Sequence, residues 1–534
     1  MDLELSLLLV IGVVTVLLIA AQFLRVPYPI LLVIGGLGLA VVPGAPDVEL
    51  EPDLVLLVLL PPLLYAAAFR TPLRELRRNL RAISLLAVGL VLATMAAVAV
   101  VAHEALDLGW AEAFVLGAVV SPTDPVAATA IARRLGVPSR IVSIVEGESL
   151  INDGTALVAY KFAVAAVVTG SFSALEASGD FIWSVLGGVG VGIIVGAAIA
   201  AVRRRLDNPP VEVTIALVSA YFAYLPADAI GVSGVLAAVT VGIYMGRLTS
   251  RLTTPTTRIQ GDAVWEIIVF LLNSALFVLV GLQLPTVVDG IGSIDGSELV
   301  ADGLLIAVVV IAVRLLWVFP LTYVPWTFGR RWRDGINPPP WRNTLIVAWT
   351  GMRGAVSLAA ALAIPLTIDG GGTFPDRELI IFLSFSVILV TLLLQGLSLP
   401  PLIKLLGVTA EDEHLQLEEA QARLRAAEVA LDRLEELREE EWVLDDTVDR
   451  IAGAYRYRQR RFTALVPEGE FDGGIDGDGV DYETRSVAYQ RLVRELLDAQ
   501  RASLVEMRDS GEIDDDVLRR IERELDLEDT RLEI

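Results

Sequence analysis

Residues 143–168 read SIVEGESLINDGTALVAYKFAVAAVV, an apolar stretch that carries the carboxylate of Asp153 near its centre. The stretch is long enough to cross the hydrocarbon core of a bilayer, which takes roughly 20 helical residues. An ionised carboxylate at that depth costs about 3 kcal/mol or more, and such groups usually mark an ion path or a proton relay. The stretch therefore predicts a membrane transporter that works by reversible protonation or cation binding at Asp153.

The composition is that of a polytopic helical membrane protein. The chain has 534 residues, of which 54% are hydrophobic, and its mean hydropathy is +0.62. It contains no cysteine, which excludes disulfides, thiolate metal sites and cysteine nucleophiles. Its two histidines, His103 and His414, are too few for a multi-histidine metal centre.

Repeated apolar runs predict an all-α fold with about thirteen membrane spans. We expect these spans at about 5–22, 28–42, 54–69, 82–102, 112–132, 141–168, 181–202, 211–226, 230–246, 262–284, 301–325, 342–366 and 378–399. The first run follows Asp2 and Glu4 rather than basic residues, which favours a spanning helix over a cleaved signal peptide.

The loops between these spans differ in charge from one side to the other. One set holds nineteen arginines, whereas the opposite set holds only Arg377. Because basic loops stay in the cytosol, this asymmetry places the N-terminus outside and the C-terminal tail in the cytosol. We expect the protein in the plasma membrane.

A hydrophilic tail follows the membrane domain, which we assign to residues 1–404. From Lys404 to Ile534 the chain has 36 acidic and 19 basic residues, so most of the net charge of −23 lies there. Leucines at helical spacing predict an acidic, helical cytosolic tail over 405–534, with a role in regulation or oligomerisation. These leucines are Leu417, Leu424, Leu431 and Leu434.

Ser121-Pro122-Thr123-Asp124-Pro125 interrupts the fifth span. Two prolines remove two backbone donors and predict a broken helix. Free carbonyls at membrane depth are tolerated where they line a cavity, and there they suit cation coordination. Thr123 offers backbone and hydroxyl oxygens, and Asp124 offsets the positive end of a half-helix.

The sixth span groups oxygen ligands beside Asp153. Ser149 and Asp153 lie four residues apart and share a helix face, with Asn152 beside them. Carboxylate, amide and hydroxyl oxygens suit a small hard cation. Asp153 can take a proton or a cation, and that competition is sufficient for exchange.

Two arginines lie within the second half of the membrane domain. Arg314 and Arg353 each need a carboxylate partner if they are buried, and Glu148 and Asp124 are the available candidates. Glycines on both sides of Arg353 predict a second interrupted helix, in the twelfth span. A broken helix in each half is typical of inverted-repeat transporters.

The seventh span contains five closely spaced glycines. We expect close helix packing there rather than a phosphate loop, because no strand or basic residue accompanies them. The glycines are Gly187, Gly188, Gly190, Gly192 and Gly196.

Four segments resemble the monovalent cation:proton antiporter-1 family, the bacterial sodium/proton exchangers, and the resemblance covers about residues 5–404. They are Leu60-Pro61-Pro62-Leu63-Leu64, Ser121-Pro122-Thr123-Asp124-Pro125, 146–156 (EGESLINDGTA) and Gly351-Met352-Arg353-Gly354-Ala355. The resemblance implies thirteen helices and a homodimer. It also implies a dimer and scaffold domain of spans 1–3 and 7–10, and a moving core of spans 4–6 and 11–13. In that core, spans 5 and 12 are broken and cross.

The resemblance also implies roles for individual residues. Asp153 matches the ion- and proton-binding aspartate and Asn152 its partner, while Thr123 and Ser149 match coordinating positions. The remaining matches are Asp124 to the acid at the helix crossing, Glu148 and Arg314 to a structural ion pair, and Arg353 to the arginine of the twelfth helix. The implied cargo is Na⁺, with Li⁺ or K⁺ as alternatives, exchanged for H⁺ without a cofactor, for pH and sodium homeostasis.

One position departs from the family pattern. Some members carry an acid two residues after the leucines of the third span, where this chain has Ala66. This departure leaves the choice between Na⁺ and K⁺ open. Members with Asn-Asp at positions 152 and 153 are generally electroneutral, and one titrating carboxylate fits one-for-one exchange.

Other classes fit the residues less well. An intramembrane aspartyl protease would use Asp124 and Asp153, but neither lies in a Tyr-Asp or Gly-x-Gly-Asp motif. A serine hydrolase would need a second glycine after Ser149. A channel rarely combines a titratable acid with broken helices in both halves. Nothing in the sequence predicts a nucleic-acid partner; the expected partners are monovalent cations, protons, membrane lipids and a second copy of the chain.

Overall fold

The structure is a computed structural model of the chain. It describes residues 28–40, 55–71, 79–170, 174–291, 295–328, 339–369, 371–408, 413–440, 442–463, 482–510 and 515–532, together with residues 12, 15, 16, 19 and 77. The described residues are overwhelmingly helical and form no strand, apart from an isolated bridge between Thr367 and Thr373. The all-α fold is therefore confirmed.

The first half of the membrane unit contains eleven described helical elements, of which two are π-helices. They are α2 (Tyr28–Ala40), η1 (Val55–Leu59), α4 (Leu60–Arg70), α6 (Leu80–Ser84), η2 (Leu85–Leu90), α7 (Val91–Leu106), α8 (Trp110–Val120), α9 (Pro125–Arg134), α10 (Ser139–Thr169), α11 (Ala174–Arg203) and α12 (Pro209–Ala229). The second half contains α13 (Gly234–Leu252), α14 (Pro255–Ile291), α15 (Gly296–Phe328), α16 (Trp341–Trp349), α17 (Ala355–Leu362) and α18 (Arg377–Leu406).

The predicted spans from the second to the thirteenth each coincide with a helix or a run of helical segments. Eight of the described helices are long and apolar enough to cross a membrane, and two shorter apolar helices cover Leu31–Ala40 and Leu57–Arg70. The first predicted span, 5–22, lies outside the described residues except for single helical positions. The count of thirteen therefore stays a prediction.

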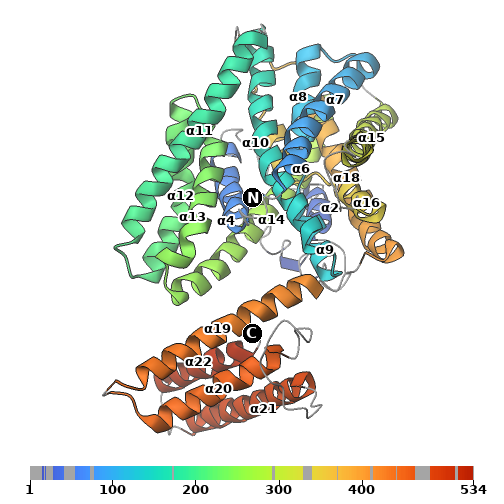
Figure 1. The fold of residues 1–534 in the computed structure, drawn as a ribbon. Coiled ribbons are helices and arrows are strands. Elements are labelled where there is room, and N and C mark those ends of the chain that lie inside the picture. The colour runs from blue at the N-terminus through green and yellow to red at the C-terminus, as the bar shows by residue number, and fades with distance from the viewer. Residues whose placement is uncertain are drawn as a thin grey trace. The chain divides into compact units, whose positions relative to one another are not determined.

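One group of helices packs α11 and α12 against α13, and α4 against the other face of α13 (Figure 1). The glycines of α11 allow this approach. A Cβ on Gly188 would lie 2.5 Å from the carbonyl oxygen of Ser233, and one on Gly192 would lie 2.7 Å from that of Ala237. The predicted packing role of these glycines is confirmed at these positions.

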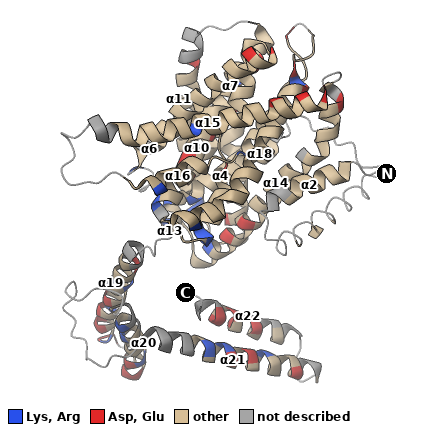
Figure 2. Cartoon of the chain, turned by 90° about the vertical axis from the view of Figure 1, so that its right-hand side faces the viewer, with Lys and Arg blue, Asp and Glu red and all other residues tan. Residues whose placement is uncertain are grey.

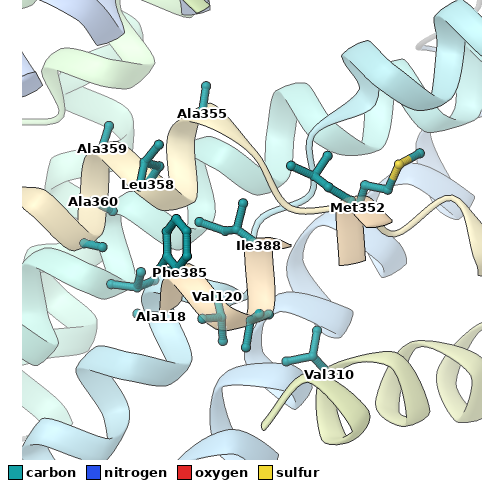
Figure 3. Close-up of a cluster of buried hydrophobic side chains, with 14 of the residues drawn as sticks. Ala118, Val120, Val310, Met352, Ala355, Leu358, Ala359, Ala360, Phe385 and Ile388 are labelled. Atoms are coloured by element: carbon teal, nitrogen blue, oxygen red, sulfur yellow. The ribbon is translucent and has the colours of Figure 1, made fainter. Parts of the chain in front are cut away.

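A second group packs α7, α8, α15, α17 and α18 together. Figure 3 shows apolar side chains of this group packed together, including Val120 of α8, Val310 of α15 and Phe385 of α18. All three are buried. This apolar cluster surrounds the interrupted helices with a medium in which uncompensated charge is costly.

The tail forms its own compact unit, Asp412–Ile534. It contains α19 (Glu413–Leu437), α20 (Asp445–Thr463), α21 (Tyr482–Asp509) and α22 (Asp515–Leu532). The helices pack in sequential pairs, α19 with α20 and α21 with α22. Arg501 joins the second pair through Asp526 at 2.9 Å and Asp529 at 3.1 Å. The helical character predicted for the tail is confirmed.

We predict that Gly192→Ala destabilises the membrane unit, whereas Gly190→Ala does not. The new methyl group at Gly192 meets a backbone carbonyl of α13, which cannot move away cheaply, and overpacking of this kind costs about 1–3 kcal/mol. A Cβ at Gly190, on the same helix, meets nothing within 4 Å. The measurement is the thermal unfolding temperature of both variants in detergent. Equal unfolding temperatures would contradict this account of the packing.

Candidate functional site

The fifth and twelfth spans are both interrupted, and the interruptions meet. α8 ends at Val120 and α9 begins at Pro125, whereas α16 ends at Trp349 and α17 begins at Ala355. The backbone N–H of Asp124 donates to the carbonyl oxygen of Met352 at 2.8 Å. The two predicted breaks are thus confirmed, and a hydrogen bond joins them at the crossing.

Asp124 lies at the positive ends of two half-helices. Its Oδ1 accepts from the N–H of Val126 at 2.8 Å, and its Oδ2 accepts from the N–H of Ala355 at 3.2 Å. One carboxylate therefore caps α9 and α17 together, where the helix dipoles favour negative charge. The fit explains the glycine before α17, because a Cβ on Gly354 would collide with this carboxylate.

Arg353 lies at the negative ends of the other two half-helices and is fully buried. Its Nε donates to the carbonyl oxygen of Val120, at the end of α8, at 2.9 Å, and its Nη1 donates to that of Gly351, just after α16. Among the described residues it forms no ion pair with a carboxylate. The expectation of a carboxylate partner is wrong for Arg353, because the carbonyls released by the helix breaks take that place.

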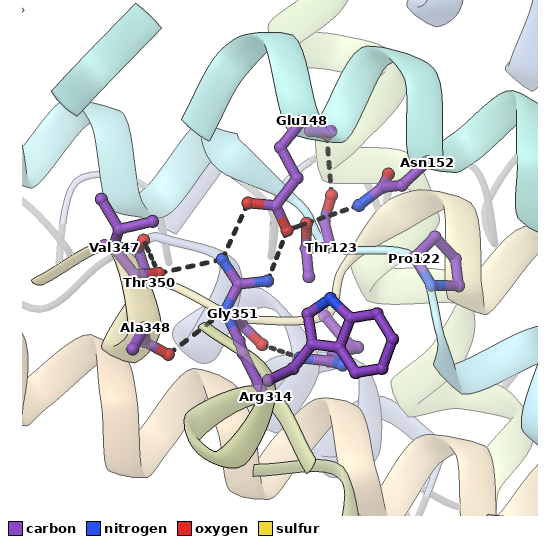
Figure 4. Close-up of polar contacts among 12 residues, drawn as sticks. Pro122, Thr123, Glu148, Asn152, Arg314, Val347, Ala348, Thr350 and Gly351 are labelled. Atoms are coloured by element: carbon purple, nitrogen blue, oxygen red, sulfur yellow. Dashed lines mark hydrogen bonds and ion pairs between the residues drawn. The ribbon is translucent and has the colours of Figure 1, made fainter. Parts of the chain in front are cut away.

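Arg314 of α15 forms a buried ion pair with Glu148 of α10 (Figure 4). Its Nη2 donates to Oε2 of Glu148 at 2.9 Å, and its Nη1 contacts Oε1. It also donates to the carbonyl oxygens of Val347 at 3.0 Å and Ala348 at 3.2 Å, in the last turn of α16. The predicted pairing of Glu148 with Arg314 is present, and it ties the sixth span to the twelfth.

Thr123 is held by three residues of α10. Asn152 Nδ2 donates to the Thr123 hydroxyl at 2.7 Å, and that hydroxyl donates to Oε1 of Glu148 at 3.4 Å (Figure 4). The hydroxyl of Ser149 donates to the Thr123 carbonyl oxygen at 2.7 Å. The structure therefore brings these predicted site residues together, and Asn152 is linked to the fifth span by its hydrogen bond to Thr123.

Asp153 differs from the other buried acids. It is 7% exposed, and its Oδ1 is buried without a hydrogen-bond partner among the described residues. Glu148 has Arg314, and Asp124 has two backbone N–H groups, but no described side chain compensates the Asp153 carboxylate. Since a lone buried charge is strongly disfavoured, we expect this carboxylate to bind a proton or a cation.

A cavity of about 780 Å³ leads to this carboxylate. Thr123, Ser149 and Asp153 line its deep part, and the cavity extends to Arg133 and Glu146. These two residues form an ion pair of 2.7 Å in which the Arg133 side chain is 65% exposed. The cavity therefore opens where Arg133, near the end of α9, meets Glu146 in the first part of α10. In Figure 2 the basic residues of the membrane unit gather toward one end, near α13 and α16.

The far wall of the cavity comes from α4 and α14 and includes Ala66 and Asn273. Ala66 lines it at the position where some family members have an acid. Asn273 of α14 also lines it and is 4% exposed. Asn273 is not among the residues expected from the sequence; its signal is an amide near the middle of the apolar run 262–284.

A resident metal site is a separate question from cation transport. The described residues contain no group of three His, Cys, Asp or Glu side chains that could hold a metal ion. The oxygen atoms around the cavity are instead one carboxylate with hydroxyl, carbonyl and amide groups. Such mixed, weakly charged sets suit a monovalent cation that must be released as readily as it binds.

We predict that Arg314→Ala lowers the free energy of unfolding by about 3–5 kcal/mol, because it leaves Glu148 buried and unpaired. Arg314→Ala combined with Glu148→Gln should recover part of the loss, since the uncompensated charge is removed. Thermal unfolding in detergent measures both variants. A stable Arg314→Ala protein with an altered choice of transported ion would contradict a structural role for the pair.

The chain is similar in sequence to a known family of proteins. The model of the family described as "Sodium/hydrogen exchanger, transmembrane" matches residues 8–405. An uncharacterised Na⁺/H⁺ exchanger of Mycobacterium tuberculosis is 38% identical over 515 residues, covering 95% of this chain and 92% of that protein. A Na⁺/H⁺ antiporter of Aphanothece halophytica is 36% identical over 403 residues, covering 75% of this chain and 74% of that protein.

Two further comparisons concern ion range and fold. A sodium, potassium, lithium and rubidium/H⁺ antiporter of Bacillus subtilis is 37% identical over 413 residues, covering 75% of this chain and 61% of that protein. The solved structure of the sodium proton antiporter MjNhaP1 from Methanocaldococcus jannaschii at pH 8 has a similar fold, with a TM-score of 0.56 and 20% identity, covering 75% of this chain and all of that one. The chain therefore belongs to the sodium/hydrogen exchanger family of membrane-spanning transporters.

Proposed function

We propose that the protein exchanges Na⁺ for H⁺ across the plasma membrane, for sodium and pH homeostasis. The observation that carries the proposal is the buried Asp153 carboxylate, which lies at the end of an open cavity without a compensating partner among the described residues. The chain's family and the names of its relatives support this transport activity over an enzymatic one.

Exchange follows from competition at one carboxylate. A proton neutralises Asp153 directly, whereas a cation neutralises it with help from the oxygens of Thr123 and Ser149. The Asp153 site is electrically neutral with either a proton or a cation bound, but the ionised carboxylate without a cation is a buried charge. The core therefore turns the site from one side of the membrane to the other with a proton or a cation bound. It rarely does so while Asp153 is ionised and empty.

Alternating access requires a barrier on the side opposite the cavity. Beyond Asp153, α10 packs against α13: a Cβ on Gly154 would lie 2.8 Å from the side chain of Leu236. Further along, Lys161 forms an ion pair of 2.8 Å with Asp228 of α12. We infer that these contacts close the outer side while the cavity faces the cytosol.

We infer the same domain division as the family resemblance implies. Spans 1–3 and 7–10 would form a scaffold that pairs with a second copy, and spans 4–6 and 11–13 would form the moving core. The close packing within α11, α12, α13 and α4, and within α8, α15, α17 and α18, supports this division. The basic loops support a cytosolic tail, a cytosolic cavity mouth and an N-terminus outside.

K⁺/H⁺ exchange is the second candidate. With Ala66 in place of an acid, the buried part of the wall formed by α4 and α14 carries no charge, which removes one ligand that would favour a small, strongly binding cation. The B. subtilis relative, whose name includes potassium and rubidium as well as sodium and lithium, supports a broad ion range. Exchange rates with Na⁺, Li⁺, K⁺ and Rb⁺ in turn decide between the two.

We predict that Asp153→Asn abolishes cation-driven pH changes in proteoliposomes, because an amide cannot exchange a proton for a cation. The matched control is Asp180→Asn, which changes an exposed acid of α11 and should leave exchange intact. Both proteins should elute as folded species in detergent. Robust exchange by Asp153→Asn would refute the proposal.

We predict electroneutral exchange, one cation for one proton, since the proposed site has a single uncompensated carboxylate. The initial rate of a pH change driven by Na⁺ should be the same at imposed membrane voltages of either sign. A steady rate that changes clearly with voltage, in vesicles without other ion permeabilities, would show that a second group takes part in the cycle.

A further inference from the structure

The cavity has two unlike walls. The core wall carries the oxygens of Thr123, Ser149 and Asp153, whereas the wall formed by α4 and α14 is apolar over much of its depth. At the mouth that second wall has Arg70 and Glu266. In its buried part, the polar side chain that it contributes to the cavity lining is that of Asn273.

Asn273 is placed on the wall by the helical repeat of α14. Glu266, Val269 and Asn273 are spaced i, i+3 and i+7, so they share the face of α14 that lines the cavity. The face leads from an exposed acid at the mouth to a buried amide at the depth of the site. It therefore adds an amide side chain to the cavity wall formed by α4 and α14.

The amide is not committed to another protein group. Asn273 is 4% exposed, and it forms no hydrogen bond with another described residue. An amide that lines a cavity and has no protein partner remains available to water or to a ligand. Since α4 and α14 pack side by side and Ala66 lies on the same wall, no acid of α4 fills this role.

We propose that Asn273 is a cation-binding and ion-selectivity residue, whose amide oxygen binds the transported monovalent cation, directly or through one water, opposite Asp153. The inference deepens the proposed antiport and rests on it. An amide oxygen adds a hard ligand without adding charge, so the count of one titrating carboxylate is kept. An acid at the same place would strengthen cation binding and add a second titrating group.

The wall on which Asn273 lies gives the ligand a second property. Asp153 belongs to the core and Asn273 to the scaffold, so a movement of the core separates the two. A cation bound by both groups is held in the conformation with the open cavity, and it loses one ligand when the core moves. The proposal therefore predicts an effect on the apparent affinity for the cation rather than on the exchange of protons by Asp153.

The test compares Asn273→Ala with Ser274→Ala in proteoliposomes, with Na⁺, Li⁺, K⁺ and Rb⁺ each as the driving ion. Ser274 is the matched control: it is the next residue of α14, is 2% exposed, has an unpartnered hydroxyl among the described residues and does not line the cavity. Loss of one ligand should raise the KM for Na⁺ about fivefold to tenfold with little change in the maximal rate. The ratio of KM values for Na⁺ and K⁺ should change as well, and Ser274→Ala should match the wild type.

Asn273→Asp is the complementary variant, because it keeps an oxygen ligand of the same size. Its KM for Na⁺ should be equal to or lower than that of the wild type. The inference is overturned if Asn273→Ala keeps the wild-type KM for every ion, or if it only lowers the yield of folded protein. An inactive wild type would instead refute the proposed antiport, and this inference with it, so the two failures are distinguishable.

Discussion

The compensation of four half-helix ends at one crossing is the interaction on which the rest of the membrane unit depends. Interrupted helices expose backbone N–H and C=O groups where no lipid can satisfy them. Asp124 accepts from the N–H groups at the starts of α9 and α17, and Arg353 donates to carbonyls at the ends of α8 and α16. One acid and one base thus satisfy both breaks, and the link from Asp124 N–H to the Met352 carbonyl fixes their register.

The same contacts determine which buried carboxylate remains without a compensating partner. Glu148 is paired with Arg314, and Asp124 is occupied by two backbone N–H groups, so Asp153 is the acid of this cluster that lacks compensation. Thr123 connects the crossing to that acid, because its backbone belongs to the break and its hydroxyl is held by Asn152. A change at the crossing would therefore move an oxygen of the proposed cation site.

Much of this could be predicted from local sequence. Prolines at 122 and 125 and glycines around Arg353 predict the breaks, because each residue type acts on its own backbone. The partners of Arg353 could not be predicted, since a free carbonyl has no side-chain signature. The pair Lys161–Asp228 joins residues that are 67 positions apart, and the place of Asn273 depends on how α14 packs beside α4. Contacts between distant helices are set by packing, which a single sequence does not display.

The unlike walls of the cavity bear on how a cation could be carried without being trapped. If both walls carried acids, the cation would be held between core and scaffold, and movement of the core would have to separate opposite charges in a medium of low polarity. In the proposed division, the carboxylate lies on the core and the amide on the scaffold, so the cation and Asp153 would move together as a neutral pair and the cation would leave behind a dipole rather than a charge. Ala66 and Asn273 are therefore consistent with one requirement, a scaffold wall that helps to bind the ion but does not oppose its departure.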